Sequence, residues 1–400
     1  MLNRKVVLHF RNMDISVFLT RSEFRDGLSS PLLPSHVENH VHFFDGDMQE
    51  LDGKKVAILG VCEHRGAVSD CQAADAPDSI RNHLYRLHWF DGALSVIDLG
   101  NIKAGNEVSD TYYALNQTCE VLLRRGIIPL ILGGSQDLTF ANYQAYEHME
   151  QTVNLVTVDY RLDIGKSDGA ISSKNYLNKV ILHKPNYLFN YSNIGHQRYL
   201  VESDLLELMG NMYFDAHRLG DIQSGMQWSE PIIRNADILS VDMSAIRMGE
   251  APGTTHPGPN GFYGDQAAQL CRYAGMSDKL TSFGLYELDP LMDLGGHTSH
   301  LASQMIWCFL EGVSQRKGDY PVGDYSDYFK YMVPITKDGQ DLVFYKSNLT
   351  DRWWMDVPYP AGMATKYERH HLVPCAYEEF QQASTEEMPD RWWKTYQKLV

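Results

Sequence analysis

The sequence predicts an α/β protein, a three-layer α-β-α sandwich around a mostly parallel sheet, followed by a C-terminal extension. Three observations predict this. Apolar runs of strand length recur through residues 54–317, and such uninterrupted runs are typical of parallel strands buried on both faces. Stretches with helical periodicity separate the runs, which predicts βαβ units. After residue 317 the pattern stops, and the chain becomes rich in Tyr, Trp, Asp and Pro.

The expected elements follow one another along the chain. The first strand, at 56–61, reads VAILGV and is apolar throughout. The helix expected next, at 77–87, has Pro77 near its first turn, where a missing N–H breaks no helical hydrogen bond. Further strands are expected at 94–99, 127–132, 154–158, 238–241 and 280–285, and further helices at 110–125 and 300–313.

The same shifts in pattern divide the chain into three parts. Residues 1–53 form a mixed N-terminal segment that we expect to pack on the main domain, which covers 54–317. Residues 318–400 form an aromatic-rich extension in which the tetrapeptide Asp-Arg-Trp-Trp occurs twice, at 351–354 and 390–393. We therefore expect the extension to lie outside the central sheet.

Composition narrows the class of function. The 400-residue chain has a formal net charge of −16, which argues against nucleic acid as a partner because phosphate binding needs a basic face. It contains no apolar run near the ~20 residues that span a bilayer, so we expect no membrane insertion. The N-terminus is too polar for a signal-peptide core. The six cysteines form no CxxC pair and are predicted to be reduced. These features predict a cytoplasmic protein.

Polar residues gather where the expected strands end. Gly133-Gly134-Ser135-Gln136-Asp137 follows one strand, Asp159-Tyr160-Arg161-Leu162-Asp163 another, and Asp242-Met243-Ser244 and Glu287 two more. Ligands bind at the carboxyl ends of parallel strands, so these residues would share one crevice if the four strands are neighbours. The sequence alone leaves the strand order open.

These motifs, in this order and spacing, resemble the ureohydrolase superfamily, which includes arginase, agmatinase and formiminoglutamase. The resemblance covers roughly residues 54–315. A stretch at 188–195, LFNYSNIG, is most similar to the formiminoglutamase branch. The motifs that carry the resemblance are APDSIR at 76–81, LGGSQD at 132–137, DYRLD at 159–163, SVDMS at 240–244 with APGT at 251–254, and ELDP at 287–290.

The resemblance implies an arginase-like fold and a site for two manganese ions, held in the family by two His and four Asp. The paired ions generate a hydroxide that attacks the carbon of a guanidinium or formimino group. Carried over residue by residue, Gln136 and Arg161 replace the two His, and Ser244 replaces one Asp. The positions that remain are the ligands Asp159, Asp163 and Asp242, with Glu287 at the position of the substrate-orienting glutamate.

The arginine at position 161, where the family has a histidine ligand, is the main reason to expect that no manganese binds. Arginine forms bidentate pairs with carboxylates, so we hypothesise that Arg161 occupies the former metal position, balances the nearby aspartates and repels Mn²⁺. An amide oxygen such as that of Gln136 is a poor substitute for imidazole as a metal ligand. We therefore expect no cofactor. The alternative is that Arg161 points into solvent and manganese binds to Asp159, Asp163 and Asp242.

Simpler roles also fit several of these residues. Asp159 and Asp163 could be loop or cap residues, and Glu287 could cap the turn before Pro290. His256 lies in the Pro-Gly-rich loop that lines the crevice in the family. It could face a ligand or have no role.

Two functions are therefore open. The first is a catalytically silent ureohydrolase homologue with a binding, scaffolding or regulatory role. The second is an active, metal-dependent hydrolase of a linear amidine such as formiminoglutamate. Family members commonly form trimers or hexamers, so we expect a homo-oligomer. Trp and Arg are typical of interface hot spots, so the extension could bind a protein partner, although packing onto the main domain is the default. The residues concerned are Trp353, Trp354, Trp392 and Trp393.

Overall fold

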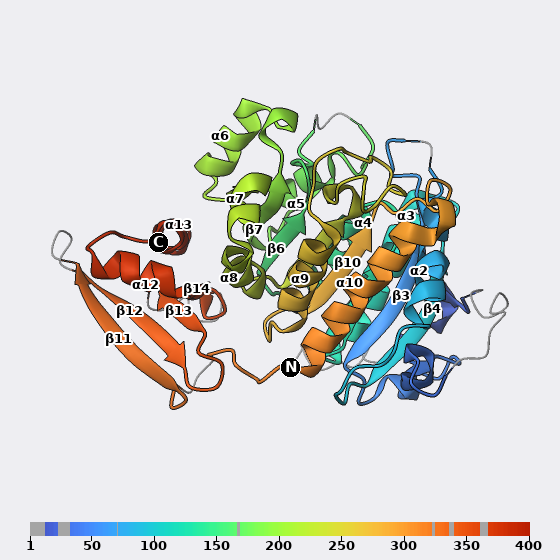
Figure 1. The fold of residues 1–400 in the computed structure, drawn as a ribbon, viewed down its shortest axis with the longest axis horizontal. Coiled ribbons are helices and arrows are strands. Elements are labelled where there is room, and N and C mark those ends of the chain that lie inside the picture. The colour runs from blue at the N-terminus through green and yellow to red at the C-terminus, as the bar shows by residue number, and fades with distance from the viewer. Residues whose placement is uncertain are drawn as a thin grey trace.

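The computed structural model describes residues 13–22, 33–69, 71–165, 169–321, 325–335, 340–360 and 367–400. A large sheet flanked by helices forms one part of the molecule, and a smaller sheet with two helices forms the other (Figure 1). Within the described ranges, no helix is both long and apolar enough to cross a bilayer.

The large sheet contains the first ten strands in the order β1-β4-β3-β5-β10-β9-β6-β7-β8, and β2 also pairs with β4. β1 runs antiparallel to β4, and the other pairings are parallel. The predicted fold class is thereby confirmed. The strands are β1 (Leu19–Thr20), β2 (Val41–Phe43), β3 (Val56–Cys62), β4 (Val96–Lys103), β5 (Ile128–Leu132), β6 (Val153–Val158), β7 (Leu188–His196), β8 (Asp215–Arg218), β9 (Ile238–Asp242) and β10 (Ser282–Tyr286).

Helices cover both faces of this sheet and form two hydrophobic cores, as parallel strands buried on both sides require. One core packs helices α2, α8, α9 and α10 on the sheet, and the other packs α3, α4 and α5 (Figure 1). The helices are α2 (Ala76–Leu84), α3 (Val108–Arg124), α4 (Leu138–Gln144), α5 (Tyr176–Leu182), α6 (Ser203–Asn211), α7 (Leu219–Ser224), α8 (Ser229–Arg234), α9 (Gly264–Gly275) and α10 (His297–Ser314).

The strand order places the predicted crevice residues together. β5, β10, β9 and β6 are consecutive neighbours in the sheet. In register, Leu132 lies beside Leu285, and Val158 lies beside Val241. Because the four strands are parallel, their carboxyl ends open on the same edge. The polar residues that follow each strand therefore meet there.

The C-terminal extension folds into a module of its own after α10. Its antiparallel sheet comprises β11 (Tyr328–Ile335), β12 (Gln340–Ser347), β13 (Trp353–Asp356) and β14 (Leu372–Cys375), covered by α12 (Tyr377–Ser384) and α13 (Asp390–Leu399). Three of the four paired tryptophans are buried in the module's interior and stabilise it by packing. They are Trp353, Trp354 and Trp392. Trp393 alone of the four is exposed, at 46 %.

The module docks at the amino-end edge of the main sheet, opposite the crevice. Arg369 forms a 2.6 Å ion pair with Asp237, which directly precedes β9. His370 stacks on Phe189 of β7 with ring centres 3.9 Å apart. Lys394 of α13 pairs with Asp215 of β8 at 2.9 Å. These contacts tie the module to the amino ends of β9, β7 and β8, in agreement with its position beside β7 and α8 (Figure 1).

Candidate functional site

The crevice is built around a guanidinium–carboxylate pair. Arg161 and Asp163 lie on the loop that follows β6, and Arg161 Nε donates to Asp163 Oδ1 at 2.9 Å. The backbone N–H of Arg161 donates to Asp159 Oδ1 at 3.0 Å. The side chain of Arg161 is 18 % exposed. It therefore points into the crevice and not into solvent.

Gln136 reaches the same carboxylates from the loop after β5. Its amide nitrogen, turned toward them, donates to Asp163 Oδ2 at 3.0 Å and to Asp159 Oδ2 at 3.2 Å, while its oxygen accepts from the Ser240 hydroxyl at 3.3 Å. This orientation satisfies both ends of the amide, which is how amide orientations are assigned. Gln136 therefore acts as a donor to the acids.

Asp242 and Ser244 close the crevice on the side of β9. The backbone N–H of Ser244 donates to Asp242 Oδ1 at 2.6 Å. The Ser244 hydroxyl is buried and has no hydrogen-bond partner among the described residues. Both side chains lie in the interior, so this strand end contributes one carboxylate and one unused hydroxyl.

Glu287 adopts a left-handed backbone conformation, with φ at 65°, which is uncommon for a residue with a side chain. Its carboxylate accepts from the backbone N–H of Gln136 at 2.7 Å and from the hydroxyl of Thr255. The backbone strain and the two bonds fix the carboxylate against the crevice floor. Glu287 thus does more than cap the turn before Pro290.

Burial raises the pKa of every carboxyl in this cluster. The pKa of Asp159 lies well above its usual range because of burial and the nearby Asp163. Burial raises the pKa of Asp163 to about 7, although Arg161 opposes the shift. Burial and Asp159 raise the pKa of Asp242, and burial and Asp242 raise that of Glu287. One guanidinium cannot balance four ionised carboxylates in a low-dielectric site, so the cluster retains protons near neutral pH.

His256 lies at the edge of this cluster. Burial, and then the positive charges of Lys174 and Arg161, lower the pKa of His256 to about 4, so its ring is neutral at pH 7. Its Nε2 is buried without a partner among the described residues. The loop histidine thus comes near Arg161, and Lys174 adds a second cation that sequence reasoning missed.

Comparison with known proteins identifies the family of this chain. The Arginase family model matches residues 54–311. The chain belongs to the arginase family. Two relatives are the formimidoylglutamases of Lysinibacillus sphaericus, 23 % identical with 65 % of this chain and 85 % of the relative covered, and of Photorhabdus laumondii, 25 % identical with 59 % and 77 % covered.

Solved structures of arginase-family proteins share the fold. The formimidoylglutamase of Bacillus subtilis superimposes with a TM-score of 0.65 at 20 % identity, covering 76 % of this chain and 98 % of that one. A Trypanosoma cruzi formiminoglutamase, crystallised with Mn²⁺, gives a TM-score of 0.61 at 19 % identity, with 66 % and 95 % covered. The C-terminal module lies beyond the residues that the family model matches.

The donor set of this arginase-family crevice does not fit a pair of manganese ions. The Arg161 guanidinium donates to one of the three aspartates, and the Gln136 amide nitrogen faces two of them. Ser244 stands at a position where the resemblance implies a carboxylate. Across the described residues, no group of three or more His, Cys, Asp or Glu side chains is arranged to hold a metal ion.

Several supporting residues escaped the sequence analysis. Ser240 holds the Gln136 amide, Thr255 holds Glu287, and Asn193 Nδ2 donates to the backbone oxygen of Arg161 at 2.9 Å. Ser240 and Asn193 lie inside stretches that carry the family resemblance, at 240–244 and 188–195, and Thr255 directly follows the one at 251–254. Those stretches are the signal that could have pointed to these residues.

Proposed function

We propose that this arginase-family protein does not carry out dimanganese hydrolysis and that its crevice has a binding or regulatory role. The observation that carries this proposal is the contact of Arg161 with Asp163. A cation held there repels Mn²⁺ and uses the lone pairs that a metal would need. Gln136 supports the proposal, since an amide N–H directed at the carboxylates cannot donate electrons to a metal.

Metal analysis of the purified full-length chain, after incubation with Mn²⁺ and desalting, tests the proposal. A restored variant carrying Gln136→His, Arg161→His and Ser244→Asp is the matched comparison. We expect substoichiometric manganese in the native chain and about two ions per chain in a folded restored variant, because two-metal sites depend on a complete set of ligands. About two ions in the native chain would contradict the proposal.

The alternative function is metal-dependent hydrolysis of a linear amidine such as formiminoglutamate. Its support is that Asp159, Asp163 and Asp242 remain in one crevice and that Glu287 is held by two hydrogen bonds. Release of formamide from formiminoglutamate by the native chain, abolished by a chelator and restored by Mn²⁺, would favour this alternative. No release from the native chain favours the silent homologue.

Assembly and partner binding are further parts of the proposal. The C-terminal module offers one exposed tryptophan of its paired motifs, Trp393, as a contact for a protein partner. Light scattering on the full chain measures whether it forms a homo-oligomer. A pull-down with native and Trp393→Ala chains tests the contact, and equal capture by both chains would rule it out.

A further inference from the structure

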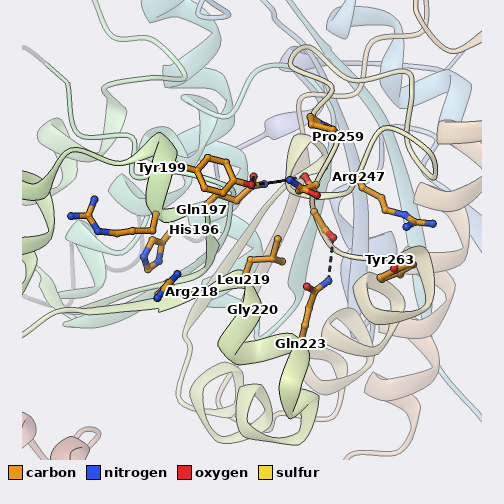
Figure 2. A pocket seen from close by; sticks show the side chains of 13 residues that line it. His196, Gln197, Tyr199, Arg218, Leu219, Gly220, Gln223, Arg247, Pro259 and Tyr263 are labelled. Atoms are coloured by element: carbon orange, nitrogen blue, oxygen red, sulfur yellow. Dashed lines mark hydrogen bonds between the residues drawn. The ribbon is translucent and has the colours of Figure 1, made fainter.

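A second cavity, distinct from the aspartate crevice, lies where β7 and β8 end. It measures about 320 Å³, opens to solvent and is lined by the end of β7 and the residues after it, the start of α7 and the loop after β9 (Figure 2). None of the crevice residues lines it. The lining side chains include His196, Gln197, Arg198, Arg218, Arg247 and Tyr263.

The cavity is positively charged in an acidic protein. Three arginines and no carboxylate line it, although the chain has a formal net charge of −16. Arg247 is already neutralised, because it pairs with Glu250 at 2.8 Å and stacks over Tyr263 at 3.8 Å. Two guanidinium groups, those of Arg198 and Arg218, therefore set the charge of the cavity.

These two arginines lack a carboxylate partner within the described ranges. Arg198 donates to the backbone oxygen of Val201 at 2.8 Å and to the Ser203 hydroxyl at 2.7 Å, which fixes its position without neutralising it. The backbone of Arg218 pairs with β7 at His196, but its guanidinium makes no hydrogen bond or ion pair with any described residue. A positioned cation beside a free one is a suitable receptor for an anion, because the planar guanidinium matches carboxylate and phosphate oxygens.

His196 adds an independent sign of a missing ligand. It is 1 % exposed, and neither ring nitrogen makes a well-formed hydrogen bond with a described residue, although the backbone of His217 lies close to the ring. Buried polar groups without partners are rare and costly. The ring lies beside Arg218 on one side of the cavity, facing the side formed by Arg247 and Tyr263 (Figure 2).

Other polar side chains that line the cavity already have hydrogen-bond partners. The Gln197 amide donates to the backbone oxygen of Asn260 at 3.0 Å, and Asn260 Nδ2 donates to the Tyr199 hydroxyl at 3.0 Å. Gln223 donates to the backbone oxygen of Gly261 at 3.2 Å. These bonds hold the two loops together around the cavity. The wall is therefore preformed, and His196 and Arg218 are the groups left to bind a ligand.

We propose that this cavity binds a small oxyanion, a carboxylate or a phosphate, that also carries a hydrogen-bond donor such as a hydroxyl. Arg218 binds the anionic oxygens, and Arg198 adds positive charge. Burial lowers the pKa of His196, so the ring is neutral at pH 7, with one nitrogen that donates and one that accepts. The accepting nitrogen is why the ligand needs a donor. The cavity volume suits a small metabolite, since small-molecule sites span about 300–1,000 Å³.

Calorimetric titration of the full-length chain with inorganic phosphate, malate and succinate tests the proposal. Malate and succinate differ by the hydroxyl. We expect phosphate or malate to bind, and the Kd to rise about tenfold or more in Arg218→Gln, because a charge-assisted hydrogen bond is worth ~1.5–3 kcal/mol. Arg86→Gln is the matched control, because Arg86 is also exposed and does not line the cavity.

The outcomes separate the sources of the anion. Tight binding of phosphate alone assigns a phosphorylated ligand, and binding of malate but not succinate assigns a hydroxycarboxylate. Failure of phosphate and malate to bind the native chain, or equal losses in Arg218→Gln and Arg86→Gln, overturns the proposal. The result is independent of manganese content, so this site and the proposed function can fail separately.

Discussion

Arg161 and Asp163 stand two residues apart on the loop after β6, and their side chains join at 2.9 Å, within hydrogen-bond reach of Asp159 and Gln136. The contact directs a permanent cation into the crevice. A protein with a similar fold, the Trypanosoma cruzi formiminoglutamase, was crystallised with Mn²⁺. The crevice still contains more buried carboxyl groups than cations. This imbalance makes the stability of the crevice depend on pH.

Replacing Arg161 with Met should destabilise the protein in a pH-dependent way. Removal of one partner of a buried ion pair costs about 3 kcal/mol or more when the other charge remains. Asp163, with its pKa raised to about 7 by burial, is largely ionised at pH 8 and protonated at pH 5. We therefore expect a loss near 3 kcal/mol at pH 8 and a smaller loss at pH 5, measured by urea unfolding. The same small change at both pH values, as expected for Arg86→Met, would count against the pairing.

Neutralising Asp242 should change the pH dependence of stability. Its folded pKa is raised by burial and by Asp159, so between the unfolded and folded pKa values the native state binds more protons than the unfolded state. Stability then falls as pH rises, by up to about 1.4 kcal/mol per pH unit for each such group. Asp242→Asn removes one contribution and keeps an oxygen to accept from Ser244.

Urea unfolding of this variant at pH 5, 6.5 and 8 measures the change. We expect Asp242→Asn to gain stability relative to the native chain as pH rises. The exposed Asp91 supplies a control, Asp91→Asn. Parallel pH profiles for the native chain and Asp242→Asn would contradict the raised pKa.

Hydrophobic pattern predicts the central strands well because their burial is uniform. The run at 56–61 corresponds to β3 at Val56–Cys62, and the run at 238–241 corresponds to β9 at Ile238–Asp242. β7 escaped the element-by-element prediction because polar residues such as Asn193 are buried within it. Asn193 lies inside because it binds the backbone of Arg161, a partner 32 residues away that periodicity does not report.

The sequence predicts which residues lie in the crevice but not which hydrogen bonds they form. Parallel strands with polar residues at their ends imply a shared site, and this brought Gln136, Asp159 and Asp242 into consideration. The direction of each side chain depends on contacts across the sheet, such as that of Gln136 with Ser240, 104 residues apart. The paired tryptophans show the same limit, since burial of Trp354 and exposure of Trp393 depend on how the module folds.

The module should be required for a stable main domain. Asp237 is fully buried, and Arg369, 38 % exposed, is its ion-pair partner. A backbone N–H also donates to Asp237, so Arg369→Met should cost about 1–2 kcal/mol, less than a fully buried pair. Deletion of residues 318–400 uncovers Asp237 and Phe189 together, and we expect the truncated chain to aggregate.

Thermal unfolding and size-exclusion chromatography measure these effects. Asp390→Ala provides the control, because Asp390 is 76 % exposed where it pairs with Lys394, and exposed pairs contribute under about 1 kcal/mol. A truncated chain that remains monodisperse and unfolds like the native chain would show that the module is an independent appendage.

Gly195 should be irreplaceable, because it links the two sites. It lies in β7 with φ at +107°, and an added Cβ would come within 2.5 Å of the Phe262 ring. The next residues include His196 in the second cavity and Gln197, whose N–H donates to the backbone oxygen of Tyr160 at 2.8 Å. Gly195→Ala should therefore cost at least about 2 kcal/mol through strain and overpacking.

The helical Gly210 gives a matched comparison for that substitution. An added Cβ at Gly210 meets nothing within 4 Å, so Gly210→Ala in α6 should raise stability by about 0.5–1 kcal/mol. Urea unfolding of the two variants measures the contrast. Because a displaced β7 end moves His196, Gly195→Ala should also weaken phosphate or malate binding, whereas Gly210→Ala should leave it unchanged. Equal stabilities for the two variants would mean that the end of β7 tolerates a side chain at position 195 and does not fix the position of either site.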